Sequence, residues 1–196
     1  MAIYQLFIQH ILNSLSTKGK AAFVVPTGFC TEKAKIALTI RKKIVDNNWL
    51  YAVVQMPPNI FATTGTNVSV VFVDKDKKTN TAILVDASKL GTKLKEGKNQ
   101  KTLLSDDDEN LIIETINNNK QIDDFSIIVD TVKVKTKNYS FGAGQYFETR
   151  IDYIELSPYE FNSKMQKYQN NLTSLFDEGR SIEKEILNNF KVLRYE

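Results

Sequence analysis

The sequence predicts an α/β fold in which a mostly parallel sheet ends in a reversed strand. Helix-like and strand-like patterns alternate over residues 1–75, and such alternation is typical of α/β proteins. The last two strands of that stretch, Leu50–Gln55 and Val68–Val73, are joined by a loop without helical periodicity, so we expect them to pair antiparallel. A length of 196 residues, 42% of them hydrophobic and 25% charged, suffices for one full core and a further appendage.

The first four predicted elements follow from the apolar pattern. Residues 3–15 carry apolar side chains at helical spacing, and Gly19 follows the end of this predicted helix. Ala21–Val25 is a short continuous apolar run, as expected for a strand that is covered on both faces. Glu32–Val45 again shows helical spacing, with most of its basic side chains on the outer side, and Leu50–Gln55 is the next strand.

The stretch Gln55–Asp74 connects two apolar strands through a loop with a restricted backbone. Pro57, Pro58 and Gly65 constrain its conformation, and Phe61 is an aromatic side chain among small polar residues. Loops that a rigid sheet holds in place often carry binding residues. We therefore expect this loop to be the functional part of the chain.

The middle of the chain adds a strand, a loop and a helix. After a fourth predicted strand at Ala82–Asp86, lysines and glycines indicate a surface loop over Lys89–Lys101. These lysines are able to meet phosphates, and a simple solvated loop explains them as well. The acidic run after Ser105 is typical of a helix start, because acids there face the positive end of the helix dipole. We favour this capping role over a metal site, and the helix continues through Leu111–Ile116.

Residues 123–150 contain two short strand-like pieces, Phe125–Val129 and Thr131–Val134, and a turn rich in tyrosine and glycine. The segment Gly142–Gln145 (GAGQ) has neither the GxGxxG spacing nor the strand–helix setting of a phosphate loop. It therefore predicts no phosphate site.

A long C-terminal helix is predicted from Ser157 onward. Ser157 and Glu160 have the spacing of a capping box, and Pro158 suits the first helical position. Apolar residues then recur at the heptad spacing of a coiled coil. At about 1.5 Å per residue this helix reaches roughly 50 Å, which is more than a small domain needs. The helix either packs on its own domain or contacts a partner helix, and we favour the second. The residues facing the partner are then Phe161, Met165, Tyr168, Leu172, Leu175, Ile182 and Ile186.

Composition bounds the remaining function classes. Lys and Arg number 26 against 23 Asp and Glu, and the net charge of +3 permits nucleic-acid binding without arguing for it. A single cysteine, Cys30, excludes an internal disulfide, and the single histidine, His10, lacks partners for zinc or triad chemistry. No apolar run approaches the ~20 residues of a membrane span, and the N-terminus lacks signal-peptide features. We therefore expect a cytoplasmic protein with no membrane contact.

Several blocks of the sequence together resemble a known family. The resemblance is carried, in chain order, by FIQHILNSLSTKGKAAFVVPTGF, IRKKIVDNNWLYAVVQMPPNIFATTGTNVSVVFVDK, NYSFGAGQYFE and DYIELSPYEFNSKMQKYQNNL. These blocks are similar to the modification (M) subunit of type I restriction–modification systems, and the second block is the most specific. The resemblance implies an N6-adenine DNA methyltransferase that uses S-adenosylmethionine. It also implies that the chain is the C-terminal half of a doubly wound, Rossmann-like methyltransferase sheet with a reversed strand hairpin, followed by a long C-terminal helix.

Two motifs of that family are missing from this sequence. One is the glycine-rich loop that binds the methyl donor, and the other is the catalytic motif Asn/Asp-Pro-Pro-Phe/Tyr. Met56-Pro57-Pro58-Asn59 differs from the catalytic motif at both ends, with methionine in the amide position and asparagine in the aromatic position. We therefore expect a C-terminal piece that is inactive alone, holds no catalytic, cofactor-binding or metal-binding residue, and binds no S-adenosylmethionine by itself.

The resemblance also implies a pocket for the target base that draws on the Asn59–Asn67 loop. We expect Phe61 to stack on the base or to form the pocket wall, with Asn59, Thr63 and Thr66 as polar neighbours. An ordinary core position for Phe61 is the alternative.

Three regions are expected: residues 1–88 as the C-terminal half of the catalytic domain, residues 89–156 as a mixed extension, and residues 157–196 as the heptad helix. The implied partners are DNA through the intact complex, the specificity subunit that reads the DNA target, and the restriction subunit. An uncovered sheet edge at Ala21–Val25 also predicts either self-association of the chain or an improvised cover of that edge. Two alternatives stay open, an assembly module that docks on the specificity subunit through its C-terminal helix, and a complementing half of a split enzyme.

Overall fold

The computed structural model describes residues 2–61, 66–96, 99–148 and 157–192 of the chain. These residues form two compact units, Met1–Glu148 and Thr149–Glu196, and each unit is described by itself. Among the described residues, no helix is both long enough and apolar enough to cross a membrane.

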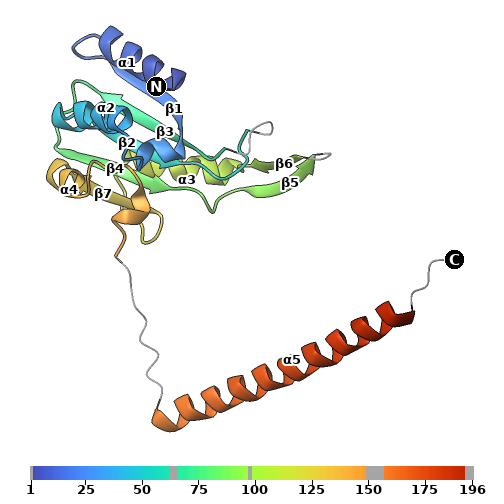
Figure 1. The fold of residues 1–196 in the computed structure, drawn as a ribbon. Helices are drawn as coiled ribbons and strands as arrows, with labels where there is room; N and C mark the ends of the chain where they lie inside the picture. Colours follow the sequence, from blue (N-terminus) through green and yellow to red (C-terminus); the bar gives the residue numbers. More distant parts are fainter. Residues whose placement is uncertain (1, 62–65, 97–98, 149–156, 193–196) are drawn as a thin grey trace. The chain divides into compact units, whose positions relative to one another are not determined.

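The first unit is built on a five-stranded sheet with the strand order β1-β3-β2-β4-β7 (Figure 1). Its strands are β1 (Lys20–Pro26), β2 (Leu50–Gln55), β3 (Val68–Asp74), β4 (Thr81–Asp86) and β7 (Ser126–Asp130). β3 runs antiparallel to both β1 and β2, whereas β2 and β4 are parallel and β7 is again antiparallel to β4. The expected α/β class and the reversed strand hairpin are confirmed. The expectation of a mostly parallel sheet is wrong for the described strand pairs, because only β2 and β4 pair in parallel and the reversed strand β3 lies between β1 and β2.

Helices cover both faces of this sheet, as in a doubly wound fold (Figure 1). α1 (Ile3–Ser14), α2 (Lys35–Asp46) and the short α4 (Thr131–Thr136) pack on one face, and α3 (Asp106–Asn117) packs on the other. The apolar spacing of the sequence explains this arrangement, since the buried residues of each helix lie on one side. Those side chains are Ile8, Leu12, Ala37, Ile40, Ile44, Val45 and Val134 on the first face, and Ile112 and Ile116 on the second.

Two segments differ from what the sequence predicts. The expected loop over Lys89–Lys101 is wrong, because this region forms an antiparallel hairpin of β5 (Thr92–Glu96) and β6 (Asn99–Leu103). The expected strand at Thr131–Val134 is also wrong, because these residues begin α4. The carboxylate of Asp130 accepts a hydrogen bond of 2.6 Å from the backbone N–H of Lys133, and this N-cap starts a helix despite the β-branched residues.

A buried arginine ties the segment after β1 to α2 and to the end of the unit. Arg41 is only 1% exposed and donates hydrogen bonds to the carbonyl oxygens of Phe29, Glu32 (2.7 Å) and Tyr139 (2.8 Å). Its guanidinium also lies 5.8 Å from the ring centre of Phe29 and 6.0 Å from that of Phe141. The short 3₁₀ helix η1 (Thr27–Cys30) that follows β1 is thereby fixed in place.

The second unit is the single helix α5 (Pro158–Val192) of 35 residues. The backbone N–H of Glu160 donates to Oγ of Ser157 (3.2 Å), and the N–H of Ser157 donates to Oε2 of Glu160 (2.9 Å), which confirms the predicted capping box. All residues of the predicted partner-facing set are exposed by 49–61%. They are Phe161, Met165, Tyr168, Leu172, Leu175, Ile182 and Ile186.

Candidate functional site

Three strands end at the same edge of the sheet, which we call the carboxyl edge. β1, β2 and β4 point in one direction and finish there at Pro26, Gln55 and Asp86. Ligands of open α/β sheets bind outside the carboxyl ends of such strands. The segments that begin at this edge are η1, the loop of residues 56–67 and the chain leading into the β5–β6 hairpin.

The loop of residues 56–67 is anchored at both of its ends. The backbone N–H of Met56 donates to the carbonyl of Val68 (3.0 Å), and the N–H of Thr27 donates to the carbonyl of Asn67 (2.8 Å). The hydroxyls of Thr27 and Ser69 lie 3.1 Å apart in a further hydrogen bond. β3 and η1 therefore fix both ends of the loop at the carboxyl edge.

The β5–β6 hairpin docks against the same loop through one residue. Thr102 is 2% exposed; its backbone N–H donates to the carbonyl of Asn59 (3.1 Å) and its hydroxyl to the carbonyl of Pro58 (2.6 Å). Asn59 has a positive φ of 58°, a left-handed conformation that asparagine tolerates better than most residues. The backbone conformation just before Phe61 is thus fixed by a contact between segments far apart in the sequence.

The predicted pocket residues lie where the sequence places the loop, but the structure describes only some of them. Phe61 is 50% exposed and belongs to neither core cluster, so it is not an interior core residue. Thr66 is exposed and Asn59 is half-buried. Thr63 lies outside the described residues. Asn59, Phe61 and Thr66 therefore share one loop at the carboxyl edge, where Phe61 and Thr66 are exposed.

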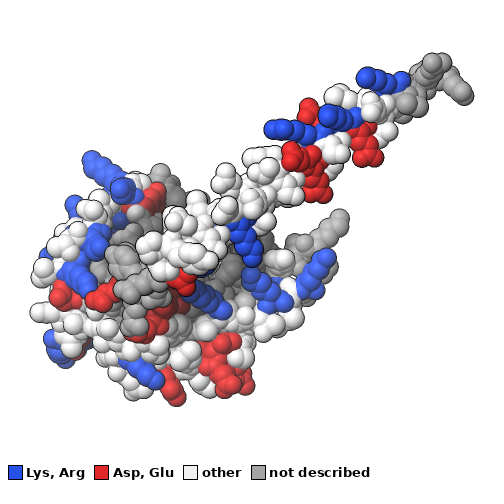
Figure 2. Space-filling model, turned by 90° about the horizontal axis from the view of Figure 1, so that it is seen from below, with Lys and Arg blue, Asp and Glu red and all other residues white. Residues whose placement is uncertain are grey.

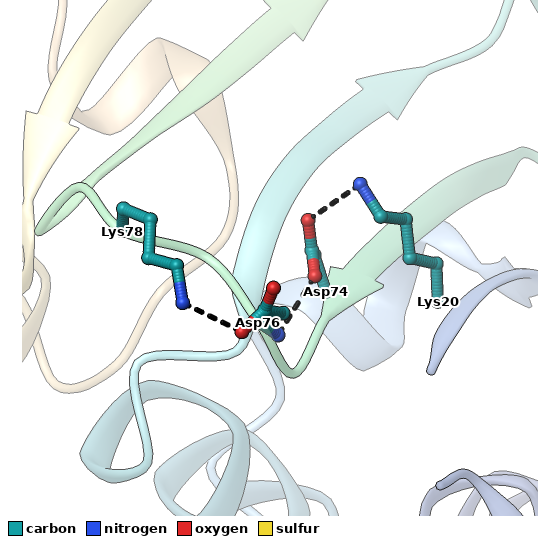
Figure 3. A network of polar contacts seen from close by, with 4 residues as sticks. All are labelled: Lys20, Asp74, Asp76 and Lys78. Atoms are coloured by element: carbon teal, nitrogen blue, oxygen red, sulfur yellow. Dashed lines mark hydrogen bonds and ion pairs between the residues drawn. The ribbon is translucent and has the colours of Figure 1, made fainter. Parts of the chain in front are cut away.

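Charged side chains gather instead at the opposite, amino edge of the sheet (Figure 3). Nζ of Lys20 lies 2.9 Å from Oδ2 of Asp74, and Nζ of Lys78 lies 2.6 Å from Oδ1 of Asp76. The backbone N–H of Asp76 also donates to Asp74 (2.8 Å). Burial of Asp74 opposes its ionisation, but the hydrogen bonds from Lys20 and Asp76 outweigh burial, and the pKa of Asp74 is lowered.

A hollow of about 390 Å³ adjoins this ion pair on the sheet face over β1 and β3. It is lined by Lys20, Ala21, Ala22, Tyr51, Phe72, Val73 and Asp74. Its two charged groups pair with each other, and it lies at the opposite end of the strands from the anchored loop. We therefore place the candidate site at the carboxyl edge, where exposed side chains stand on a fixed backbone.

Sequence reasoning missed the hairpin and the role of Thr102. The local signal was weak, since Leu94 is the only apolar residue of Thr92–Glu96 and no regular alternation marks a strand there. The density of lysine and glycine favoured a surface loop instead. The bond from Thr102 to Asn59 had no local signal at all, because it joins residues 43 positions apart.

Comparison with known proteins gives consistent matches. Residues 2–152 match the family described as N-6 DNA Methylase. The methylase subunit of the type I restriction enzyme MpnII from Mycoplasma pneumoniae is 31% identical over 151 residues, which cover 76% of this chain and 27% of that protein. The MjaIX methylase subunit from Methanocaldococcus jannaschii is 24% identical over 192 residues, covering 92% and 33%.

Among solved structures, the methyltransferase subunit of a type I restriction–modification system from Streptococcus thermophilus superposes with a TM-score of 0.67 at 23% identity. The match covers 76% of this chain and 31% of that one. A second structure, concerned with complex assembly and conformational transition of the type I R-M system, covers 94% of this chain and 40% of its own, with a TM-score of 0.60 at 19% identity. The chain thus spans about a third or less of the curated relatives described above, and these two structures share its fold.

Proposed function

This chain belongs to the N-6 DNA methylase family, and on that premise we propose that it forms the C-terminal part of a type I modification subunit. The intact enzyme transfers a methyl group from S-adenosylmethionine to N6 of adenine in DNA. The observation that carries the proposal is the family match over residues 2–152, combined with a half-exposed aromatic residue, Phe61, on an anchored loop at the carboxyl edge.

Phe61 is suited to hold a base that has left the duplex. The amine of adenine is buried in the stack of duplex DNA, so an enzyme that modifies it extrudes the nucleotide and packs the base between aromatic or apolar groups. Phe61 is exposed by 50%, and its loop is fixed through Asn59 by Thr102. A stacked aromatic contributes about 1–3 kcal/mol per base. Phe61, with Asn59, Thr63 and Thr66 as polar neighbours, is the proposed wall of the base pocket.

The chemical step requires groups that this sequence does not contain. Its Pro-Pro pair is flanked by Met56 and Asn59 rather than by an amide or acid and an aromatic residue, and Pro57 is buried. No glycine-rich loop follows a strand of the described sheet: β1 runs into Thr27–Cys30 and β2 into the proline loop. The described residues therefore do not fit a binding site for S-adenosylmethionine, and we propose that the chain is inactive alone.

Methyl transfer assays test whether the chain is inactive alone and active with a second polypeptide that supplies the missing groups. The purified chain is mixed with tritiated S-adenosylmethionine and unmethylated DNA, with and without a polypeptide that carries the glycine-rich loop and the Asn-Pro-Pro-Phe motif. We expect label in DNA only when both polypeptides are present, and none when the asparagine of that motif is replaced by alanine. Transfer by the chain alone would contradict the proposal.

A substitution in the complemented enzyme tests Phe61 itself. Phe61→Ala is expected to lower kcat/KM by about 5- to 150-fold, which is the stated stacking energy expressed as a rate. Phe61→Tyr keeps the ring and most of the activity. Phe7→Ala is the matched control, because Phe7 is an exposed phenylalanine (63%) on α1. Equal activities of Phe61→Ala and the control would remove Phe61 from the pocket.

A second candidate function rests on α5. A 35-residue helix whose heptad apolar side chains are about half exposed is typical of a helix that binds another helix. The alternative is thus an assembly module that docks on the specificity subunit, with the restriction subunit as a further member of the complex. Leu172→Glu and Ile182→Glu are expected to abolish co-purification with the specificity subunit, whereas Asn170→Glu, outside the heptad seam, leaves it intact. Retention of the complex by both apolar variants would exclude this surface.

A further inference from the structure

The β5–β6 hairpin carries basic side chains on an arm that extends past the sheet next to the Phe61 loop (Figure 1). We propose that the hairpin face bearing Lys93 and Lys95 contacts the phosphate backbone of DNA whose target base lies at Phe61. This inference rests on the proposed methyltransferase function and adds a DNA-contact surface to it.

The register of the hairpin places these lysines on a defined face. Lys93 lies opposite Thr102, and Lys95 lies opposite Gln100. Residues directly opposite each other in an antiparallel pair share a face of the ribbon. Lys93, Lys95 and Gln100 are exposed, whereas Thr102 on the same face is buried against the loop. The basic face therefore continues directly from the point where the hairpin meets the loop.

The contact between hairpin and loop fixes the basic face near Phe61. Thr102 bonds to the carbonyls of Pro58 and Asn59, which precede Phe61 by three and two positions. A base that stacks on Phe61 remains attached to its sugar and to the two flanking phosphates. The phosphates of the extruded nucleotide and its neighbours then pass beside this loop, where lysine is a common partner for them.

The charges of the hairpin are free to act on a polyanion. No ion pair within the described part of the chain engages Lys93 or Lys95. Figure 2 shows basic side chains interspersed with acidic ones on one face of the molecule. The nearby acids at Asp106–Glu109 belong to the first turn of α3, where Asp108 bonds to Ser105 as part of its cap. Exposed, unpaired lysines beside a base-binding loop favour nucleic acid as the partner.

The opposite face of the hairpin has a different character. Leu94 and Leu103 are exposed by 46% and 43%, and they share that face with Thr92 and Lys101. An apolar face of this kind suits a protein contact, so it defines the competing outcome of the test.

The test measures the salt dependence of DNA binding. The complemented enzyme is titrated with a fluorescein-labelled duplex at several salt concentrations, for the wild type and for the Lys93→Gln/Lys95→Gln double variant. Each lysine–phosphate contact adds about 0.9 to the slope of log K against log salt, so we expect the double variant to lower the magnitude of the slope by about 1.8. Its affinity falls for all duplex sequences alike, because phosphates carry no sequence information.

Two matched variants make the result specific. Lys133→Gln/Lys137→Gln removes the same charge from exposed lysines on and just after α4, and the slope is expected to stay at the wild-type value. Leu94→Gln/Leu103→Gln alters the opposite face of the hairpin and is also expected to leave the slope unchanged. The proposal is overturned if the Lys93/Lys95 variant keeps the wild-type slope, or if only the Leu94/Leu103 variant weakens the complex.

The same enzyme separates failure of this inference from failure of the proposed function. In methyl transfer assays, the Lys93→Gln/Lys95→Gln variant is expected to raise KM for DNA while kcat stays near the wild-type value. A wild-type enzyme that transfers methyl groups, together with a double variant of unchanged KM, would reject the hairpin surface alone. A wild-type enzyme that binds DNA through the lysines but transfers no methyl group would reject the proposed function alone.

Discussion

Replacing the buried arginine Arg41 by methionine is expected to destabilise the sheet unit by about 3 kcal/mol. Arg41 joins three segments, because it donates to the carbonyls of Phe29, Glu32 and Tyr139 from a position that is 1% exposed. Methionine fills much of the same space between the rings of Phe29 and Phe141 but offers no donor. The loss of stability therefore comes from the missing hydrogen bonds rather than from poorer packing.

The magnitude follows from two opposing contributions. A hydrogen bond from a charged donor contributes about 1.5–3 kcal/mol, so three such bonds make the loss large. Removing the guanidinium also removes the cost of burying a charge, and burial lowers the pKa of Arg41 for the same reason. The lost hydrogen bonds outweigh the removed cost of burial, and the net loss of unfolding free energy is about 3 kcal/mol. Arg41→Lys keeps the charge without the planar fork and is expected to lose about half as much.

Urea denaturation monitored by tryptophan fluorescence measures this loss. Trp49 is the single tryptophan; it packs against the core cluster, and Nζ of Lys75 lies 4.7 Å from its ring centre. Lys42→Met is the matched control, since Lys42 is the exposed neighbour of Arg41 on α2. A loss of unfolding free energy below about 1 kcal/mol for Arg41→Met, or a loss equal to that of the control, would refute this stabilising role of Arg41.

Three further outcomes are expected. Burial raises the pKa of Cys30 from 9.0 to about 11, so the contribution of its thiol to stability is present below pH 9 and is lost between pH 9 and 11. The difference in urea stability between the wild type and Cys30→Ala should therefore shrink over that pH range, and a constant difference would contradict this expectation. Thr102→Val removes the 2.6 Å bond to Pro58 and should cost about 1 kcal/mol and speed amide exchange in β6, whereas unchanged exchange would show that the hairpin docks by other contacts. β1 has one strand neighbour in the described sheet and Val24 is 50% exposed, so the isolated chain should self-associate in light scattering, and a clean monomer speaks against it.

Local chemistry made much of the fold predictable. Leu50–Gln55 coincides with β2 because a continuous apolar run lies between two asparagines and two prolines. Ser105 and Ser157 begin α3 and α5 because their side chains bond to groups three residues ahead. These signals lie within a few residues of the structure they cause, so no knowledge of the fold was needed to read them.

The errors arose where a local cap was missed or where distant parts of the chain decide the conformation. Thr131–Val134 has the β-branched residues of a strand, yet the carboxylate of Asp130 caps a helix and Val134 packs into the core at 1% exposure. The fixed geometry of the Phe61 loop depends on Thr102, a residue of the hairpin that follows the sheet strands. The prolines predicted the loop from the sequence, whereas the contact of Thr102 with the loop is visible only in the folded structure.

The two edges of the sheet use the same residue type in opposite ways. At the amino edge, Lys20 and Lys78 pair with carboxylates (Figure 3). Lys77 donates to backbone carbonyls there. At the carboxyl edge the backbone groups of the loop bond to Thr27, Val68 and Thr102, while Lys93 and Lys95 engage no carboxylate in the described part of the molecule. A net charge of +3 hides this difference, because charge that is neutralised by a local partner cannot attract a distant polyanion as strongly as charge that is not. This distribution of the lysines favours the edge that carries Phe61 for the proposed DNA contact.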